Sequence, residues 1–291
     1  MDSVSRPWRS VLYIPASRER ALEKARSLPV DAIIFDLEDA VAPDEKPAGR
    51  ALLAQTLATG GYGARASLVR INDLGTDWAR DDISAMAACG PDAILLPKVN
   101  GAADIEALAG LMERHEGFRG TAIWAMMETP AGILNAAEIA AAPRMAGFVL
   151  GTNDLAKELH CNLGGDRVQM MTSLQICLLA ARAAGIICID GVYNAFKDED
   201  GLTAECAQGR RLGMDGKSLI HPAQVGIAND IFRPSAEDVE LARRQIEAFD
   251  AALAKGEAVA VVDGKIVENL HVATAHATLA KAEAIAAMEQ S

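Results

Sequence analysis

The chain has 291 residues, of which 51% are hydrophobic, and this is enough to bury one large core. Its net charge of −12 argues against nucleic acid or an anionic membrane as the main partner, although a local basic cluster can still bind a small anion. No apolar run approaches the roughly 20 residues that span a bilayer, and residues 1–9 lack the apolar region of a signal peptide. The five cysteines include no CxxC pair, so we expect free thiols and a cytoplasmic location.

Short apolar runs recur along the chain, with helical patterns between them. Their starts are about 20 to 40 residues apart, which is the length of a βα unit. Eight such units predict a closed (β/α)₈ TIM barrel. An open doubly wound sheet is the alternative, but it would usually carry a Gly-rich phosphate loop after its first strand, and none follows Ile14. The runs cover residues 10–14, 32–37, 67–71, 93–97, 122–127, 147–150, 186–190 and 217–220.

Several helix ends are marked by capping residues. Ser17 is expected to cap a helix over residues 18–28, and Ser235 with Asp238 forms a capping box before a helix that ends ahead of Gly256. Residues 258–267 then predict a β-hairpin with a two-residue turn, after which Asn269 would cap a last helix to about residue 288. We therefore divide the chain into a barrel domain, 1–232, and a C-terminal segment, 233–291, that acts as a lid or oligomerisation arm; the alternative is a segment that only packs on the barrel floor.

Acidic and basic side chains follow the second, third and fourth predicted strands. Asp36, Glu38 and Asp39 lie so close in sequence that some must pair with a cation, approach metal-bound water or take up a proton. Arg70 ends the third run and needs an anionic partner, which a carboxylate or a substrate oxygen would supply. Lys98 follows the fourth run, where it could pair with Asp36 or Glu128 or contact the substrate directly.

Glu128 and Asp154 follow the fifth and sixth runs. Because the carboxyl ends of parallel strands meet at one rim, the two carboxylates form an oxygen-rich site suited to Mg²⁺, with Mn²⁺ as a substitute. Two solvated loop acids are the plainer interpretation. The turn Gly151, Thr152 and Asn153 could offer backbone N–H groups to a substrate carboxylate. An α-hydroxy- or α-keto-carboxylate that chelates the metal, with its developing charge neutralised beside Arg70, would suit this rim.

Other rim residues have both structural and functional interpretations. Asp190 could fix a neighbouring loop, and His221 before Pro222 is either a hydrogen-bonded wall residue or a catalytic group. Arg18 and Lys24, after the first run, form either a solvated basic face or a site for the phosphates of a large substrate.

The motifs together resemble the citrate lyase β-subunit-like branch of the HpcH/HpaI aldolase family. They run through nearly the whole barrel, and the second strand ends Asp-Leu-Glu-Asp where pyruvate aldolases of the family carry Asp-x-Glu-His. The resemblance implies a TIM barrel with Mg²⁺ on Glu128 and Asp154, Arg70 polarising a carbonyl and CoA phosphates near Arg18 and Lys24. The segments are residues 9–15, 35–41, 69–72, 96–98, 127–129, 151–155 and 220–222.

The resemblance also implies a homotrimer or homohexamer in which the C-terminal segment covers a neighbouring site. The tail, residues 261–271, is similar to the (3S)-malyl-CoA thioesterase subgroup, with Glu268 where malyl-CoA lyases of the family carry an Asp. Hydrolysis of (S)-malyl-CoA is therefore the expected activity, with Glu268 as base, Arg70 on the carbonyl and Asp36 and Glu38 as further catalytic groups. A C–C lyase acting on a malyl-, methylmalyl- or citramalyl-CoA is the alternative, and a non-catalytic acyl-CoA-binding subunit is a second one.

Overall fold

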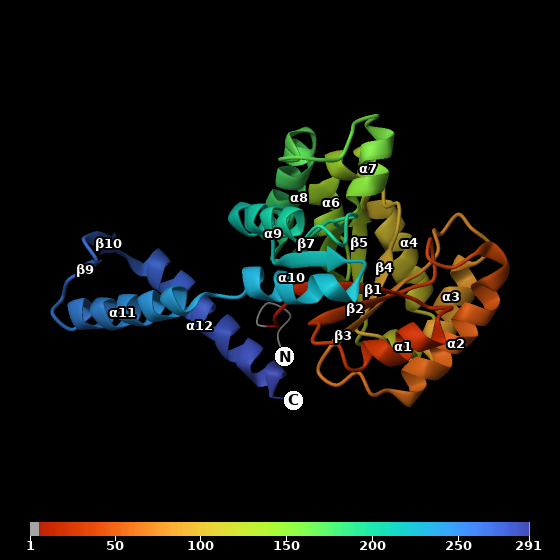
Figure 1. Cartoon of the computed structure of the whole chain (residues 1–291), viewed down its shortest axis with the longest axis horizontal. Coiled ribbons are helices and arrows are strands. Elements are labelled where there is room, and N and C mark those ends of the chain that lie inside the picture. Colours follow the sequence, from red (N-terminus) through yellow and green to blue (C-terminus); the bar gives the residue numbers. More distant parts are fainter. Residues whose placement is uncertain (1–5, 291) are drawn as a thin grey trace. The chain divides into compact units, whose positions relative to one another are not determined.

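The computed structural model describes residues 6–290 of the chain. These residues form two compact units (Figure 1), one made of residues 8–232 and the other of residues 233–290 with the short segment before Trp8. Each unit has a hydrophobic core of its own. In the part of the chain that is described, no helix combines the length and hydrophobicity needed to cross a bilayer.

The first unit is a closed barrel of eight parallel strands. The chain order is also the order around the barrel, which closes because β1 pairs with β8 as well as with β2: Leu12 lies opposite Ile33, and Val11 opposite Ser218. The expected TIM barrel is confirmed, and the open sheet is excluded. The strands are β1 (Ser10–Pro15), β2 (Ala32–Asp36), β3 (Ala66–Arg70), β4 (Ala93–Leu96), β5 (Ala122–Met127), β6 (Met145–Leu150), β7 (Ile187–Asp190) and β8 (Gly216–Leu219).

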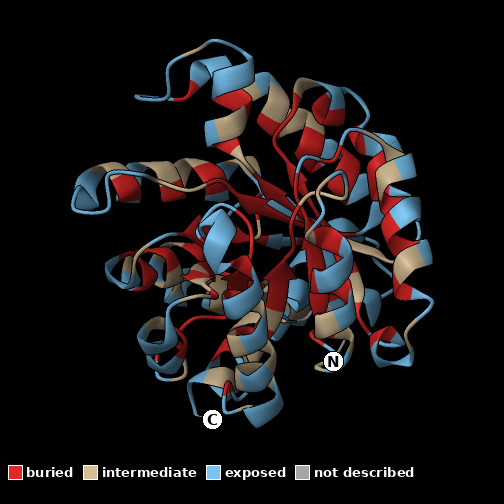
Figure 2. Cartoon of the chain, turned by 90° about the vertical axis from the view of Figure 1, so that its right-hand side faces the viewer, coloured by how far each residue is buried: buried red, intermediate tan, exposed pale blue. Residues whose placement is uncertain are grey.

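Helices connect successive strands and cover the outside of this barrel. Buried residues gather on the strands and on the helix faces turned toward them, whereas the outer helix faces are exposed (Figure 2). The helices are α1 (Glu19–Ala25), α2 (Lys46–Thr59), α3 (Ala79–Ala87), α4 (Ala102–Met112), α5 (Pro130–Leu134), α6 (Ala136–Ala140), α7 (Thr152–Glu158), α8 (Met171–Ala184), α9 (Glu199–Leu212) and α10 (Val225–Phe232).

The prediction that Ser17 caps the first helix is wrong. Arg18 is the N-cap of α1, and no side chain accepts a hydrogen bond there. Ser17 lies one residue too early, and its hydroxyl is buried instead. The helix is also shorter than predicted, because it ends at Ala25 rather than near Leu28.

Side chains alternate along each strand between the barrel interior and the helix layer. Alternation follows from the two-residue period of a β-strand. The interior is filled by small and branched side chains around Trp124, against which Trp8 packs with ring centroids 4.8 Å apart. The inward set is Val11, Ala32, Ile34, Ala66, Leu68, Ala93, Leu95, Trp124, Met126, Val149, Ile187 and Ile189.

A buried ion pair joins the first two strands at their amino ends. Arg9 precedes β1 and Asp31 precedes β2; Arg9 Nε lies 3.0 Å from Asp31 Oδ2, and its Nη2 lies 2.9 Å from Oδ1. The backbone N–H of Arg9 donates to the same carboxylate at 2.7 Å. This two-pronged contact fixes the base of the barrel, opposite the rim where the functional residues are expected.

The second unit consists of two long helices that pack on each other and are connected by a small hairpin. It contains α11 (Ala236–Leu253), β9 (Ala260–Val262), β10 (Lys265–Val267) and α12 (Asn269–Glu289). The Ser235–Asp238 capping box is confirmed, and the hairpin turns at Asp263 and Gly264, both with positive φ, as a type I′ turn requires. The predicted cap of the last helix is wrong by one residue, since Glu268 is the N-cap and Asn269 already lies in the helix.

All five cysteines are free thiols, as expected. Three of them are buried and two are partly exposed: Cys177, Cys188 and Cys206 belong to the first group, and Cys89 and Cys161 to the second.

Candidate active site at the barrel rim

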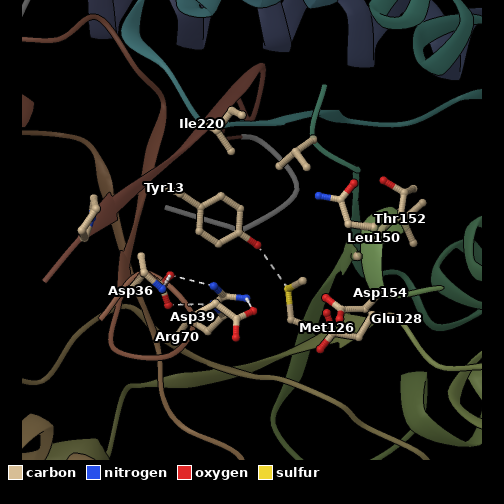
Figure 3. Close-up of a pocket in the computed structure, with 15 residues that line it drawn as sticks. Tyr13, Asp36, Asp39, Arg70, Met126, Glu128, Leu150, Thr152, Asp154 and Ile220 are labelled. Atoms are coloured by element: carbon tan, nitrogen blue, oxygen red, sulfur yellow. Dashed lines mark hydrogen bonds and ion pairs between the residues drawn. The ribbon is translucent and has the colours of Figure 1, made fainter. Parts of the chain in front are cut away.

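The predicted rim residues continue the inward-facing series of their strands. Asp36 follows Ile34 on β2, Arg70 follows Leu68 on β3, and Glu128 follows Met126 on β5, each by two residues. They open into a cavity of about 370 Å³ at the carboxyl ends of the strands (Figure 3). Its walls are formed by Tyr13, Pro15, Asp36, Asp39, Ala40, Arg70, Met126, Glu128, Leu150, Gly151, Thr152, Asn153, Asp154, Val192 and Ile220.

Arg70 is held in place by the acidic residues that follow β2. Its Nε and Nη2 donate to the two oxygens of Asp36 at 2.8 and 2.6 Å, and its Nη1 lies 2.9 Å from Glu38 Oε2. Asp39 is more exposed and lies 3.6 Å from the same Nη1. Although burial opposes its charge, the Asp36 carboxylate raises the pKa of Arg70. The predicted repulsion among the three acids is therefore resolved by a fixed cation.

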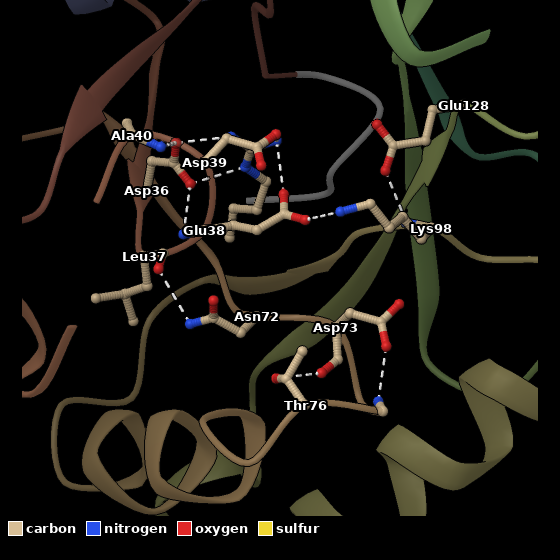
Figure 4. A network of polar contacts seen from close by, with 12 residues as sticks. Asp36, Leu37, Glu38, Asp39, Ala40, Asn72, Asp73, Thr76, Lys98 and Glu128 are labelled. Carbon is tan, nitrogen blue, oxygen red and sulfur yellow. Dashed lines mark hydrogen bonds and ion pairs between the residues drawn. The ribbon is translucent and has the colours of Figure 1, made fainter. Parts of the chain in front are cut away.

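Lys98 pairs with Glu38, a partner that differs from both predicted ones. Its Nζ lies 2.5 Å from Glu38 Oε1, whereas only its backbone N–H reaches Glu128, at 2.7 Å from Oε1 (Figure 4). The residue has a φ of 53°, in the left-handed region. Burial raises the pKa of Glu38, and Arg70 and Lys98 oppose that rise. The ammonium group thus extends the charged network from β2 and β3 to the end of β4.

Glu128 and Asp154 lie together on the far side of the cavity from Asp36 (Figure 3). Glu128 is almost fully buried, and burial raises its pKa to about 7, with neighbouring carboxylates contributing and the Lys98 N–H opposing. A cation bound here would offset the cost of keeping both groups ionised. Gly151 makes room for Glu128, since a Cβ at position 151 would lie 2.4 Å from the Glu128 Cβ. The donor set therefore fits a hard divalent ion.

The turn after β6 supplies the remaining wall. Thr152 is buried at the start of α7, and Asn153 exchanges two side-chain hydrogen bonds with Asn194, at 3.2 and 2.7 Å. This amide pair joins the first turn of α7 to the loop that follows β7. Gly151, Thr152 and Asn153 thus all line the cavity, and the contact of their backbone N–H groups with a substrate carboxylate stays a prediction.

Two residues that sequence reasoning missed fix the loop after β2. Lys46 Nζ donates to the backbone carbonyls of Leu37 and Glu38, each at 2.9 Å, and burial lowers its pKa. The Asn72 side-chain amide also donates to the Leu37 carbonyl, at 3.0 Å. Asn72 follows β3, whereas Lys46 begins α2, eight residues after Glu38, and neither side chain carries a local sequence signal that assigns it to this loop.

Asp190 and His221 both make contacts that stabilise the protein itself. Asp190 is fully buried on the outward side of β7, where Arg167 Nη1 lies 2.8 Å and Lys217 Nζ 3.3 Å from its oxygens. It fixes the loop that carries Arg167, as one interpretation of the sequence proposed. His221 Nδ1 accepts the Ala223 N–H at 3.1 Å, and its ring stacks on Phe196.

The remaining predicted residues lie apart from the cavity wall. Among the residues that the structure describes, neither Arg18, Lys24 nor Lys98 lines the cavity. Arg18 and Lys24 are exposed at the start and in the last turn of α1, about 9 Å apart along the helix. Glu268 belongs to the second unit, where its side chain is exposed and its backbone N–H donates to His271 Nδ1 at 3.0 Å.

Tyr13 and Met126 line the cavity, although sequence reasoning assigned them no role. Tyr13 follows the inward-facing Val11 by two residues, so the two-residue period of the strand could have indicated that its side chain also faces inward. The Arg70 guanidinium carbon lies 5.1 Å from the Tyr13 ring centroid, and the Tyr13 hydroxyl lies 3.2 Å from Met126 Sδ.

Comparison with known proteins identifies the family of this chain. Residues 9–222 match the family model described as HpcH/HpaI aldolase/citrate lyase. The chain is 60% identical to the (3S)-malyl-CoA thioesterase of Cereibacter sphaeroides (strain ATCC 17025 / ATH 2.4.3), over all 291 residues and the full length of both proteins. It is 34% identical to the citrate lyase subunit beta of Escherichia coli (strain K12), over 96% of this chain and 94% of that subunit.

A solved structure agrees with both the fold and the family. The protein CitE from Mycobacterium tuberculosis, crystallised with magnesium, acetoacetate and coenzyme A, superposes with a TM-score of 0.77 and 29% identity, covering 96% of this chain and 99% of that one. The chain belongs to the HpcH/HpaI aldolase/citrate lyase family.

Proposed function

We propose that this member of the HpcH/HpaI aldolase/citrate lyase family is a Mg²⁺-dependent enzyme that hydrolyses (S)-malyl-CoA to malate and CoA. The observation that carries the proposal is the 60% identity, over the full length, to a (3S)-malyl-CoA thioesterase. The cavity supports the proposal, because Arg70, Glu128 and Asp154 all line it. Such a constellation suits a substrate that has both a carboxylate and a reactive carbonyl.

Glu128 and Asp154 are the residues that would hold the metal. Mg²⁺ usually takes one or two carboxylates and completes its shell with water and substrate oxygens. Within residues 6–290 there is no group of three or more His, Cys, Asp or Glu side chains placed to enclose a metal, which matches this open arrangement. When bound, the ion would hold the carboxylate and hydroxyl oxygens of the malyl group and neutralise their charge. Mn²⁺ prefers similar ligands and should substitute.

Arg70 is the group we assign to the thioester carbonyl. Two of its five N–H groups donate to Asp36, and Glu38 faces Nη1, so its orientation is fixed before substrate binds. A preorganised cation stabilises an oxyanion without rearrangement during the reaction. Asp36 and Glu38, predicted as catalytic, would then act by positioning Arg70 and Lys98.

Glu268 is the base we propose for the attacking water. Its exposed carboxylate lies on the second unit, at the start of α12, where a neighbouring copy could receive it. This role requires a homo-oligomer, which we propose to be a trimer or hexamer. Arg18 and Lys24 remain our candidates for the CoA phosphates, because both are exposed cations on the helix that follows β1.

Product analysis on (S)-malyl-CoA separates this function from its alternatives. With purified chain and Mg²⁺, we expect free CoA and malate to appear together without glyoxylate. Release of glyoxylate with acetyl-CoA would instead establish a C–C lyase, the alternative favoured by the likeness to citrate lyase subunit beta. If neither reaction occurs, the remaining alternative is a non-catalytic acyl-CoA-binding subunit.

A variant pair tests the proposed base. Glu268→Gln should abolish CoA release, because the amide cannot take a proton from water. Glu257→Gln changes another exposed acid of the same unit and should leave the rate unchanged. Equal rates in both variants would remove Glu268 from the mechanism.

A further inference from the structure

Tyr13 crosses the barrel mouth from β1 toward β5, the strand four positions away in the closed barrel. Its hydroxyl points at Met126, with Arg70 on one side of the ring and Glu128 and Asp154 beyond the sulfur (Figure 3). All of these residues line the same cavity. The phenol therefore lies between the proposed cation that stabilises the carbonyl and the proposed metal ligands.

The bond made by this hydroxyl is weak compared with those of the other tyrosines. Tyr62 donates to the Leu22 carbonyl at 3.1 Å, and Tyr193 donates to Asp198 Oδ2 at 2.6 Å. Tyr13 instead donates to a thioether sulfur at 3.2 Å, and a thioether is a weak acceptor. Polar groups this close to the interior usually find strong partners, so a group left on a weak one can exchange it for a better acceptor at little cost.

We propose that Tyr13 donates a hydrogen bond to the thioester carbonyl oxygen of the substrate and forms a two-donor oxyanion site with Arg70. The assignment rests on the proposed thioester chemistry of this cavity. A phenol has an ordinary pKa of about 10 and is protonated at neutral pH, so it can donate without changing its charge. Arg70 supplies the positive charge beside it, held against the Tyr13 ring.

The placement of the other groups indicates which substrate oxygen Tyr13 meets. Glu128 and Asp154, on the far side of Met126, would hold the metal and with it the malyl carboxylate and hydroxyl. The oxygen that lies between Tyr13 and Arg70 is then the reacting carbonyl, because the acyl chain extends from the chelated end toward the thioester.

Each electron pair and proton has a defined place in this step. The water oxygen bonds to the carbonyl carbon as its proton leaves to the base, and the C=O π pair moves onto the carbonyl oxygen. Tyr13 and Arg70 donate to that oxygen, and both keep their protons. The pair then re-forms the C=O bond as the C–S bond breaks, and the CoA thiolate leaves and is protonated by solvent.

Tyr13→Phe tests the proposal because it removes one oxygen atom and keeps the ring against Arg70. We expect kcat for CoA release to fall by about 10²- to 10³-fold, the usual effect of losing one oxyanion donor, with little change in KM for malyl-CoA. Tyr62→Phe is the matched control: it removes a hydroxyl that donates to a backbone carbonyl away from the cavity, and kcat should stay at the wild-type value.

Thermal unfolding of both variants checks that the fold is retained. An unchanged kcat in Tyr13→Phe, or a rise in KM alone, would overturn the inference, because the hydroxyl would then make no contact specific to the transition state. If the wild-type protein releases glyoxylate rather than CoA, the proposed hydrolysis fails, and the same variant is assayed on that reaction. A lyase also develops negative charge on the thioester oxygen, so a loss of kcat there still supports the role of Tyr13, and its absence still refutes it.

Discussion

The close approach of Gly151 to Glu128 allows a quantitative prediction for Gly151→Ala. A Cβ at this position would lie 2.4 Å from the Glu128 Cβ and 2.5 Å from Oε2, whereas ordinary van der Waals contact begins at 3.4 Å. Glu128 must therefore move by about 1 Å. Rotation of the carboxylate cannot relieve the clash, because the nearest atom is the Cβ. Gly151 has a φ of −95°, which alanine also adopts, so the effect must come from this contact.

We expect the variant to fold but to lose activity. A displacement of about 1 Å in a reacting site costs about 10²-fold in rate, or about 2.7 kcal/mol of transition-state stabilisation. The assay is kcat/KM for CoA release from (S)-malyl-CoA over a range of Mg²⁺ concentrations. Because Glu128 is the displaced residue, the Mg²⁺ concentration for half-maximal rate should rise as well.

The matched control is Gly110→Ala in α4. A Cβ there meets nothing within 4 Å, and alanine favours a helix interior by about 1 kcal/mol over glycine. This variant should keep full activity and gain a little stability. Wild-type kcat/KM and Mg²⁺ dependence in Gly151→Ala would refute the assignment of Glu128 to the metal.

Three further predictions concern Arg70, the metal and the buried Asp190 network. Arg70→Lys loses the paired hydrogen bonds to Asp36 and should lower kcat by about 10²- to 10³-fold with the circular dichroism spectrum unchanged. A chelator should abolish turnover and added Mg²⁺ should restore it; turnover in excess chelator would exclude a metal role. Asp190→Asn removes one of the two carboxylates that pair with Lys217 and Arg167 and leaves Glu205 as the other, so urea denaturation should show a loss of about 3 kcal/mol, and an unchanged midpoint would contradict this. Although burial opposes ionisation, Lys217 and Arg167 lower the pKa of Asp190. Its contribution to stability is therefore complete above the unfolded value of about 3.9 and is lost as pH falls through the lower folded pKa, so wild-type stability should decline more steeply in that acid range than that of the variant.

The barrel and its rim could be predicted because both follow from local patterns. Apolar runs of strand length at βα spacing indicate the eight strands, and parallel strands bring their carboxyl ends together. Arg70, Glu128 and Asp154 share one cavity for this reason. The ends of helices were less predictable: the caps expected at Ser17 and Asn269 are each displaced by one residue, since a cap depends on the φ and ψ of a single residue.

Contacts between strands could not be predicted in the same way. Lys98 directs its side chain to Glu38 and its backbone N–H to Glu128, and the sequence does not indicate which group meets which acid. Lys46 reaches the β2 loop from a helix, a contact that has no signal in one sequence. Tyr13 was detectable only by counting inward positions from Val11. The contribution proposed for Glu268 would depend on assembly, which the pattern of a single chain does not encode.

The Arg9–Asp31 pair at the base of the barrel has a consequence for how this protein can diverge. It joins β1 and β2 at the ends opposite the cavity, and Trp8 closes the same end against Trp124. The contacts that stabilise the barrel therefore lie at the amino ends of the strands, whereas the residues that would contact substrate lie at the carboxyl ends. A lineage, or a directed-evolution library, can exchange residues around the mouth to accept another acyl group while the anchored base keeps the scaffold intact.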